Sequence, residues 1–93
     1  QISYTAFGYI DKTVVAASVD HIAPTNKNVA AGKYPIWSYE HIYTNGKPKP
    51  AVAKFLKYLT SEEIQSTLVP KLGYISIHDM RVIRQVDGEI TVK

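Results

Sequence analysis

Residues 24–36 read PTNKNVAAGKYPI, which predicts a helix of about two turns with a signal at each end. Thr25 can accept a hydrogen bond from the backbone N–H groups of the first turn, which have no partners inside the helix. Asn28 stands three residues later, where a reciprocal cap prefers Glu or Gln. Gly32 can take the left-handed conformation that ends a helix, and Pro35 opposes its continuation. The stretch contains no nucleophile, metal ligand or strong acid, so it predicts scaffold rather than chemistry.

Three segments around this helix have the composition of β-strands. Residues 2–7, ISYTAF, are rich in β-branched and aromatic side chains, and residues 13–19, TVVAASV, are almost continuously apolar. A continuous apolar run is typical of a strand covered on both faces, as in α/β proteins. Residues 36–44, IWSYEHIYT, predict a third strand. Alternation along it places four rings on one face: Trp37, Tyr39, His41 and Tyr43.

Two helices are expected in the next part of the chain. Apolar residues in residues 52–59 recur at the spacing of one buried helix face: Val52, Phe55, Leu56 and Leu59. Thr60 and Glu63 form a capping box for a second helix. The expected buried stripe of that helix is Ile64, Leu68 and Leu72. Pro70 should kink or end it, because proline has no N–H to donate, and Gly73 closes the unit.

Two further pairs predict turns. Asn45 and Gly46 precede a proline-containing linker and tolerate positive φ, whereas Asp87 and Gly88 lie between two apolar runs. Because Asp-Gly favours tight hairpin turns, we expect a C-terminal hairpin.

Composition places the chain among globular proteins. It has 93 residues, 45% hydrophobic and 20% charged, a formal net charge of +3 and no cysteine. Disulfides, thiolate metal sites and thiol nucleophiles are therefore excluded. No apolar run approaches the roughly 18 residues that span a bilayer. The sequence opens in the middle of a predicted strand, so we expect it to be a piece of a longer protein.

No constellation of catalytic or metal-binding residues emerges. The three histidines are not at metal-ligand spacing, and surface positions are the simpler interpretation: His21, His41 and His78. No Ser stands in a nucleophile turn, and no Gly-rich phosphate loop occurs. Glu62 and Glu63 suit the positive end of a helix dipole better than a catalytic pair. The aromatic face of residues 36–44 lacks the interleaved Arg or Lys of a nucleic-acid platform. We therefore expect no enzyme, catalytic residue, metal, cofactor or nucleic-acid partner.

The order of four segments resembles one known family. They read ISYTAFGYID, VDHIAPTNKNVAAGKYPI, SYEHIYTNG and PAVAKFLKYLTSEEIQSTLVPKLGYISI. Over residues 1–77 this is similar to the C-terminal part of the phosphate-binding proteins of bacterial ABC importers, the PstS family. That family commonly shows GxIGY, PTxEN(I/V)xxGxYP, LYIYTKG and GQxxVxKLGYIPL in the same order. Four positions depart from the pattern, at caps and turns: Ser3, Lys27-Asn28, Pro70 and Ser76.

The resemblance implies part of a type II periplasmic-binding-protein fold, an α/β architecture with a mixed sheet and flanking helices. Two lobes joined by crossing strands close on the ligand by a hinge motion. Residues 1–35 would then belong to one lobe, residues 36–46 to a crossing strand and hinge, and residues 47–77 to the other lobe. Residues 78–93 would form a tail with the expected hairpin.

The resemblance also implies a function. The chain would be a fragment of the extracytoplasmic solute-binding protein that captures inorganic phosphate for an ABC importer, with permease subunits as its membrane partners. The full protein would be lipid-anchored at the cell surface or in the periplasm. The family's phosphate contacts lie upstream of Gln1, so no ligand-binding residue is assigned here. The alternatives are a receptor for another oxyanion, a signalling relative, or a stand-alone protein-interaction module. We expect the isolated chain to form homo-oligomers through open strand edges.

Overall fold

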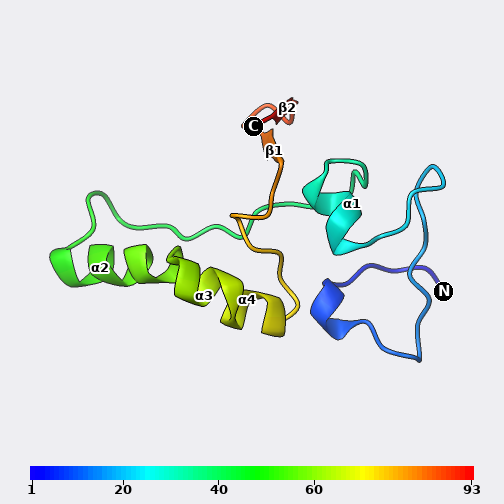
Figure 1. Ribbon diagram of the computed structural model, residues 1–93, viewed down its shortest axis with the longest axis horizontal. Coiled ribbons are helices and arrows are strands. Elements are labelled where there is room, and N and C mark those ends of the chain that lie inside the picture. Colours follow the sequence, from blue (N-terminus) through cyan, green and yellow to red (C-terminus); the bar gives the residue numbers. More distant parts are fainter.

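The computed structural model describes residues 1–93 as short helices joined by extended segments, with one small sheet (Figure 1). The helical elements are the 3₁₀-helix η1 (Phe7–Tyr9), α1 (Asn26–Ala30), α2 (Pro50–Leu59), α3 (Glu62–Ser66) and α4 (Leu68–Lys71). The strands are β1 (Val82–Arg84) and β2 (Ile90–Val92). None of the helices is both long enough and apolar enough to cross a lipid bilayer.

Helix α1 has the predicted signals at both ends, although it is shorter than the predicted two turns. The Thr25 side chain accepts a hydrogen bond of 3.1 Å from the backbone N–H of Asn28, as the cap prediction requires. The Asn28 amide does not reach back to Thr25 and instead donates to the carbonyl of Ala23 at 2.9 Å. Gly32 has a φ of +77°, which confirms its role as the helix stop.

Helices α2, α3 and α4 follow one another along one side of the molecule (Figure 1). The predicted capping box at Thr60 is wrong. Thr60 is the C-cap of α2, and its hydroxyl donates to the carbonyls of Leu56 and Lys57, at 3.3 and 3.2 Å. A threonine hydroxyl next to free terminal carbonyls bonds to them in preference to the following helix. Ser61 is the N-cap of α3 and makes no side-chain cap bond.

The predicted disturbance at Pro70 is confirmed. Pro70 cannot donate to the carbonyl of Ser66, and its ring crowds that carbonyl. The helix accordingly breaks at Thr67, with φ −118° and ψ −72°, and resumes for one turn as α4. Gly73, with a φ of +88°, then ends the unit, as predicted.

The three predicted strands, residues 2–7, 13–19 and 36–44, are wrong as sheet elements. These residues are largely extended or irregular, η1 begins at Phe7, and the one sheet pairs β1 with β2. The chain makes 36 backbone–backbone hydrogen bonds, where a compact domain of this length makes about 60. A strand needs a neighbour to satisfy its backbone, and these 93 residues place none beside the three segments.

The predicted hairpin is confirmed. Strands β1 and β2 pair antiparallel, with Val82 opposite Val92 and Arg84 opposite Ile90. The N–H of Gly88 donates to the carbonyl of Gln85 at 2.9 Å, and the φ of Gly88 is +92°. A glycine in the left-handed region at the end of the loop is typical of three-residue hairpin loops.

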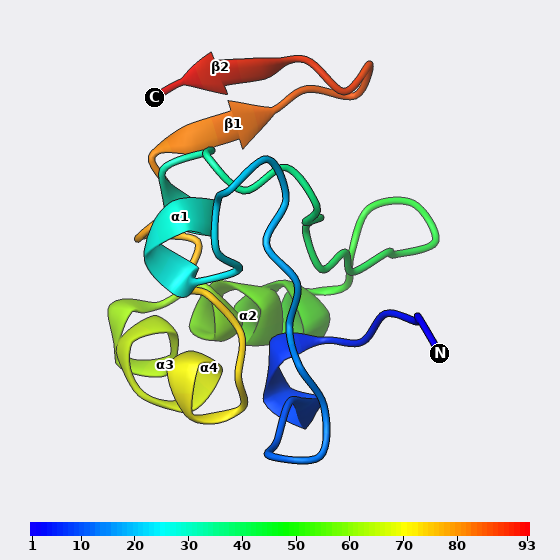
Figure 2. The same ribbon diagram turned by 90° about the vertical axis from the view of Figure 1, so that its right-hand side faces the viewer.

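The core lies between this hairpin and α1. Its four buried apolar residues are Val29, Tyr34, Met80 and Val82. The backbone N–H of Arg81 donates to the carbonyl of Ala30 at 2.8 Å, and the Val82 side chain lies against Gly32, where an added Cβ would be 2.9 Å from it. Figures 1 and 2 show the hairpin and α1 on one side, α2 to α4 on the other, and residues 36–48 between them.

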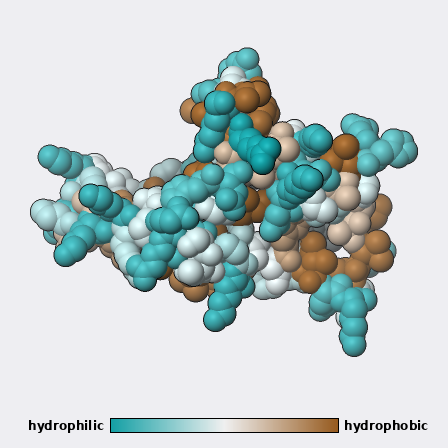
Figure 3. Space-filling model, viewed as in Figure 1, coloured by the Kyte–Doolittle hydropathy of each residue, from teal (hydrophilic) through white to brown (hydrophobic).

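The molecule is more open than a compact domain of its size. Its radius of gyration is 15.3 Å, whereas about 12 Å is expected for 93 residues. The stripes predicted to be buried on the helices are only partly covered. Leu56, Leu59 and Ile64 are half-buried, whereas Val52, Phe55, Leu68 and Leu72 are 42–58% exposed. Apolar surface is also exposed around the hairpin and over the N-terminal loop (Figure 3).

Candidate functional site

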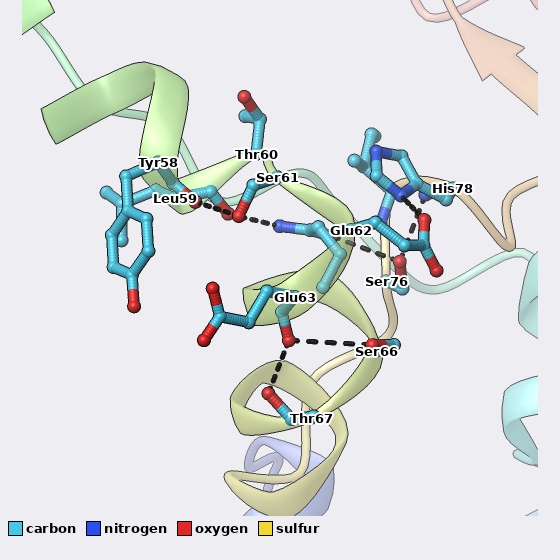
Figure 4. A network of polar contacts seen from close by, with 12 residues as sticks. Tyr58, Leu59, Thr60, Ser61, Glu62, Glu63, Ser66, Thr67, Ser76 and His78 are labelled. Carbon is cyan, nitrogen blue, oxygen red and sulfur yellow. Dashed lines mark hydrogen bonds and ion pairs between the residues drawn. The ribbon is translucent and has the colours of Figure 1, made fainter. Parts of the chain in front are cut away.

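A buried polar network joins α3 to the chain that follows α4 (Figure 4). Gln65, which is 9% exposed, donates from Nε2 to the carbonyl of Leu59 at 2.8 Å. Its Oε1 accepts from the Ser76 hydroxyl at 3.1 Å and from the backbone N–H of Ile77 at 2.9 Å. The Ser76 hydroxyl also accepts from the N–H of His78 at 3.1 Å. The buried polar atoms of Gln65 and Ser76 all have hydrogen-bond partners within the chain. The network therefore stabilises the connection between α3 and the segment after α4, and it leaves no unpaired donor or acceptor for a ligand.

The structure brings together two titratable residues that the sequence analysis treated separately. Nδ1 of His78 lies 2.9 Å from Oε2 of Glu62, with the side chains 41% and 79% exposed. Glu62 and Glu63 occupy the first turn of α3, as predicted for the positive end of the helix dipole. The contact between His78 and Glu62 spans 16 residues, and the sequence pattern did not indicate it. A contact this exposed contributes at most about 1 kcal/mol to stability.

The other two histidines lie elsewhere. His21 is exposed in a tight turn, with a φ of +66°, next to a single bridge between Val19 and Ile22. His41 is exposed within residues 36–44. No group of three or more His, Asp or Glu side chains in the chain is arranged to hold a metal ion.

The predicted aromatic face of residues 36–44 is present even though the segment is in no sheet. Successive rings contact one another: Trp37 and Tyr39 lie 5.2 Å apart edge to face, Tyr39 and His41 6.3 Å, and His41 and Tyr43 5.9 Å. The first two pairs are close to edge to face, whereas the planes of His41 and Tyr43 are tilted by 31°. Trp37 and Tyr39 are half-buried, whereas His41 and Tyr43 are exposed, so only the start of the row packs against other parts of the chain.

Arg84 of β1 closes over the start of this row. Its Cζ lies 4.4 Å from the centre of the Trp37 ring, and one guanidinium nitrogen donates to the carbonyl of Pro35 at 3.1 Å. Its backbone N–H donates to the Tyr39 hydroxyl at 3.1 Å. Sequence patterns did not indicate this contact, because Arg84 and Pro35 are 49 residues apart and only the fold brings them together.

One groove of about 480 Å³ lies between α1 and the segment after α4. Lys27, Lys33 and Arg81 supply positive charge at its walls, and Asp79 supplies negative charge. Ser76 is the buried polar side chain of the wall, and it is already bonded to Gln65. The groove therefore offers exposed cationic side chains and no buried, unbonded donor.

A smaller pocket of about 230 Å³ lies beside a close backbone contact. An added Cβ on Gly73 would lie 2.5 Å from the Cα of Gly8, and one on Gly8 would lie 2.8 Å from the carbonyl oxygen of Leu72. Only glycines fit this crossing of η1 and the end of α4.

The charged surface holds one perturbed carboxyl group. The hydroxyl and the backbone N–H of Thr13 both donate to the carboxylate of Asp11 and lower its pKa from the usual 3.8. The group is fully exposed in a turn and serves the backbone rather than a ligand.

Comparison with known proteins identifies the family. Residues 2–63 match the family model described as the PBP superfamily domain. The chain is 47% identical over 89 residues to the phosphate-binding protein PstS of Bacillus subtilis (strain 168), which covers 95% of the chain and 30% of that protein. The chain thus spans about a third of the length of this relative. The resemblance read from the sequence and the α/β class are confirmed: the chain belongs to the PBP superfamily.

Proposed function

We propose that this chain is the C-terminal part of an extracytoplasmic solute-binding protein that captures inorganic phosphate for an ABC importer. The observation that carries the proposal is the 47% identity over 89 residues to a phosphate-binding protein. The role is binding without catalysis. The proposal includes ABC permease subunits as membrane partners and a lipid anchor on the full-length protein.

The surface area supports a place inside a larger fold. The chain exposes 8049 Å², about 2,600 Å² more than the roughly 5,400 Å² of a compact protein of 10.4 kDa. An ordinary protein–protein interface covers about 800 Å² on each partner. The excess is therefore better matched by a large covering polypeptide than by one small partner.

The same proposal assigns the parts of the chain. Residues 1–35 would belong to one lobe, residues 36–46 to the crossing strand and hinge, and residues 47–77 to the other lobe. Residues 78–93 pack on α1 through Met80 and Val82, so in this proposal the tail belongs with the lobe of residues 1–35. The groups that hold phosphate would come from polypeptide outside these 93 residues.

A chimera tests whether the chain completes a receptor. The 89 aligned residues of the Bacillus subtilis protein are replaced by those of this chain, and phosphate binding is measured by calorimetry. We expect a dissociation constant within about tenfold of the parent's. The matched control is the parent with the segment deleted, which should not bind. A folded chimera that does not bind phosphate would overturn the proposal and favour a stand-alone interaction module.

The isolated chain gives a second test. We expect it to bind phosphate too weakly for calorimetry to detect and to self-associate through its uncovered apolar surface. Light scattering over a wide concentration range should give a mass above 10.4 kDa. A monomer at every concentration would contradict the expectation.

The anion is tested separately, because the chimera would take its phosphate groups from the parent. The full-length receptor that the proposal requires should bind phosphate at least a hundredfold more tightly than sulfate or molybdate. A preference for another oxyanion would favour that alternative.

A further inference from the structure

The contacts of Arg84 hold one end of the extended segment and leave the other end free. Its guanidinium lies on Trp37 and donates to Pro35, and its backbone donates to Tyr39. A guanidinium over an indole face is attracted to the ring, which adds to these hydrogen bonds. Residues 35–39 are therefore attached to β1 at three points.

Beyond Tyr39 the attachment ends. No backbone–backbone hydrogen bond joins residues 36–48 to any other part of the chain. Tyr43 is 85% exposed, and Gly46 has a φ of +77° with nothing within 4 Å of an added Cβ. Within these 93 residues, the attachment is therefore confined to the start of the segment.

Arg84 belongs to β1, the strand that packs against α1 in the buried core of the molecule. Val82, two residues earlier on β1, is 5% exposed and rests against Gly32. The N–H of Lys93 donates to the carbonyl of Arg81 at 3.0 Å, which ties the end of the hairpin to its start. The hairpin and α1 thus form one base that carries Arg84, and Figure 2 shows the hairpin lying over α1.

We propose that Arg84 is a positioning residue, which clamps residues 35–39 to the hairpin and so fixes the direction in which the crossing segment leaves it. The inference rests on the proposed function, in which residues 36–46 connect two lobes that close on a ligand. A crossing segment whose start is held in one orientation leaves fewer open arrangements of the two lobes to compete with closure.

The clamp is tested in the chain itself through Trp37, its single tryptophan. Quenching by acrylamide is measured at micromolar concentration in R84M, R84K and the charge-matched control R81M. We expect the quenching constant to be about twofold higher in R84M than in the unsubstituted chain and unchanged in R81M. In R84K, which keeps the positive charge, we expect a value between those of the unsubstituted chain and R84M. Circular dichroism should show the same helix content in all four proteins. No rise in R84M, or an equal rise in R81M, would overturn the clamp.

Positioning is tested in the chimeric receptor. We expect R84M to weaken phosphate binding at least threefold, R84K to restore most of the loss, and R81M to match the unsubstituted chimera. Unchanged affinity in R84M would overturn the positioning role even if the quenching changed. If the unsubstituted chimera did not bind phosphate, the proposed function would fail, whereas the quenching of Trp37 would still decide whether the clamp exists.

Discussion

The hairpin region and the helical limb make opposite use of their apolar side chains. In the hairpin region, which is α1 and residues 80–93, Met80 and Val82 are 6% and 5% exposed. In the helical limb, which is α2, α3 and α4, no apolar side chain is fully buried, and Phe55 is 57% exposed. Both regions have amphipathic sequences, so the difference lies in what each finds to pack against.

The comparison shows where the chain is complete and where it needs other polypeptide. The hairpin region finds its partner within the 93 residues, because residues 80–82 return to α1. The helical limb leaves part of its apolar stripe in solvent, at Val52, Phe55, Leu68 and Leu72. A stripe of four apolar residues on a helix is a stable arrangement only when something covers it. The predictions below test this contrast.

The largest expected effect is in the hairpin core. Met80→Ala should lower the free energy of unfolding by about 3 kcal/mol, because it leaves a cavity among Val29, Tyr34 and Val82. Phe55→Ala in the helical limb should change it by less than about 1 kcal/mol. Urea denaturation of the isolated chain measures both. In the chimeric receptor, Phe55→Ala should lower the free energy of unfolding by about 3 kcal/mol. A loss below about 1 kcal/mol there would contradict the inference that the rest of the receptor covers the helical limb.

The glycine crossing is the closest contact of the helical limb. Gly73→Ala should cost about 2 kcal/mol or more, since the added Cβ meets Gly8 and the φ of +88° is strained for alanine. Gly46→Ala is the matched control, with a φ of +77° and open space around it, and should cost about 1 kcal/mol. Thermal unfolding compares the two variants. Equal losses would mean that only backbone strain matters at Gly73.

The polar joint between the limb and the rest of the chain should contribute less. Ser76→Ala removes a donor to Gln65 and an acceptor for the N–H of His78, and should cost about 1–2 kcal/mol. Ser66→Ala removes only a long, exposed contact to Glu63 and should lie within about 0.5 kcal/mol of the unsubstituted chain. Chemical denaturation measures the difference. Indistinguishable variants would show that the network is not closed in solution.

The helix cap of the hairpin region should contribute about 1 kcal/mol. Thr25→Ala removes the acceptor of the Asn28 N–H, a loss typical of N-caps. Thr60→Ala should cost less than about 0.5 kcal/mol, because Thr60 caps no following helix. If Thr60→Ala were the more damaging change, the capping box predicted from the sequence would exist after all.

The smallest effect concerns pH. The pKa of Asp11 is lowered in the folded chain by Thr13, so this contact stabilises the fold above the usual pKa of 3.8. The stabilisation is lost as the pH falls through the lowered folded-state pKa. Thr13→Val should move the pKa of Asp11 up toward 3.8 in an NMR titration. A pKa unaffected by the substitution would contradict the hydrogen bonds.

Local signals in the sequence were sufficient for the helices, the turns and the family. The cap at Thr25, the stop at Gly32, the break near Pro70 and the turn at Gly88 each depend on groups within a few residues, and each is confirmed. Two local patterns were wrong. The hydroxyl of Thr60 bonds to carbonyls of the preceding helix, a competing local contact, and the strand-like segments have no neighbouring strand within these residues. The candidate site was less predictable, since the contacts of Gln65, His78 and Arg84 join residues 11 to 49 positions apart.

The sequence by itself determined that this chain has a short helix capped by Thr25, a C-terminal hairpin and the segment order of a phosphate-binding-protein family. These features follow from dihedral preferences and hydrogen bonds between near neighbours. Only the tertiary structure decided that the tail supplies half of the buried core and that Arg84 holds the start of the extended segment. Burial and long-range contacts depend on which segments, distant in the sequence, pack together in the fold. A local sequence pattern does not specify those segments.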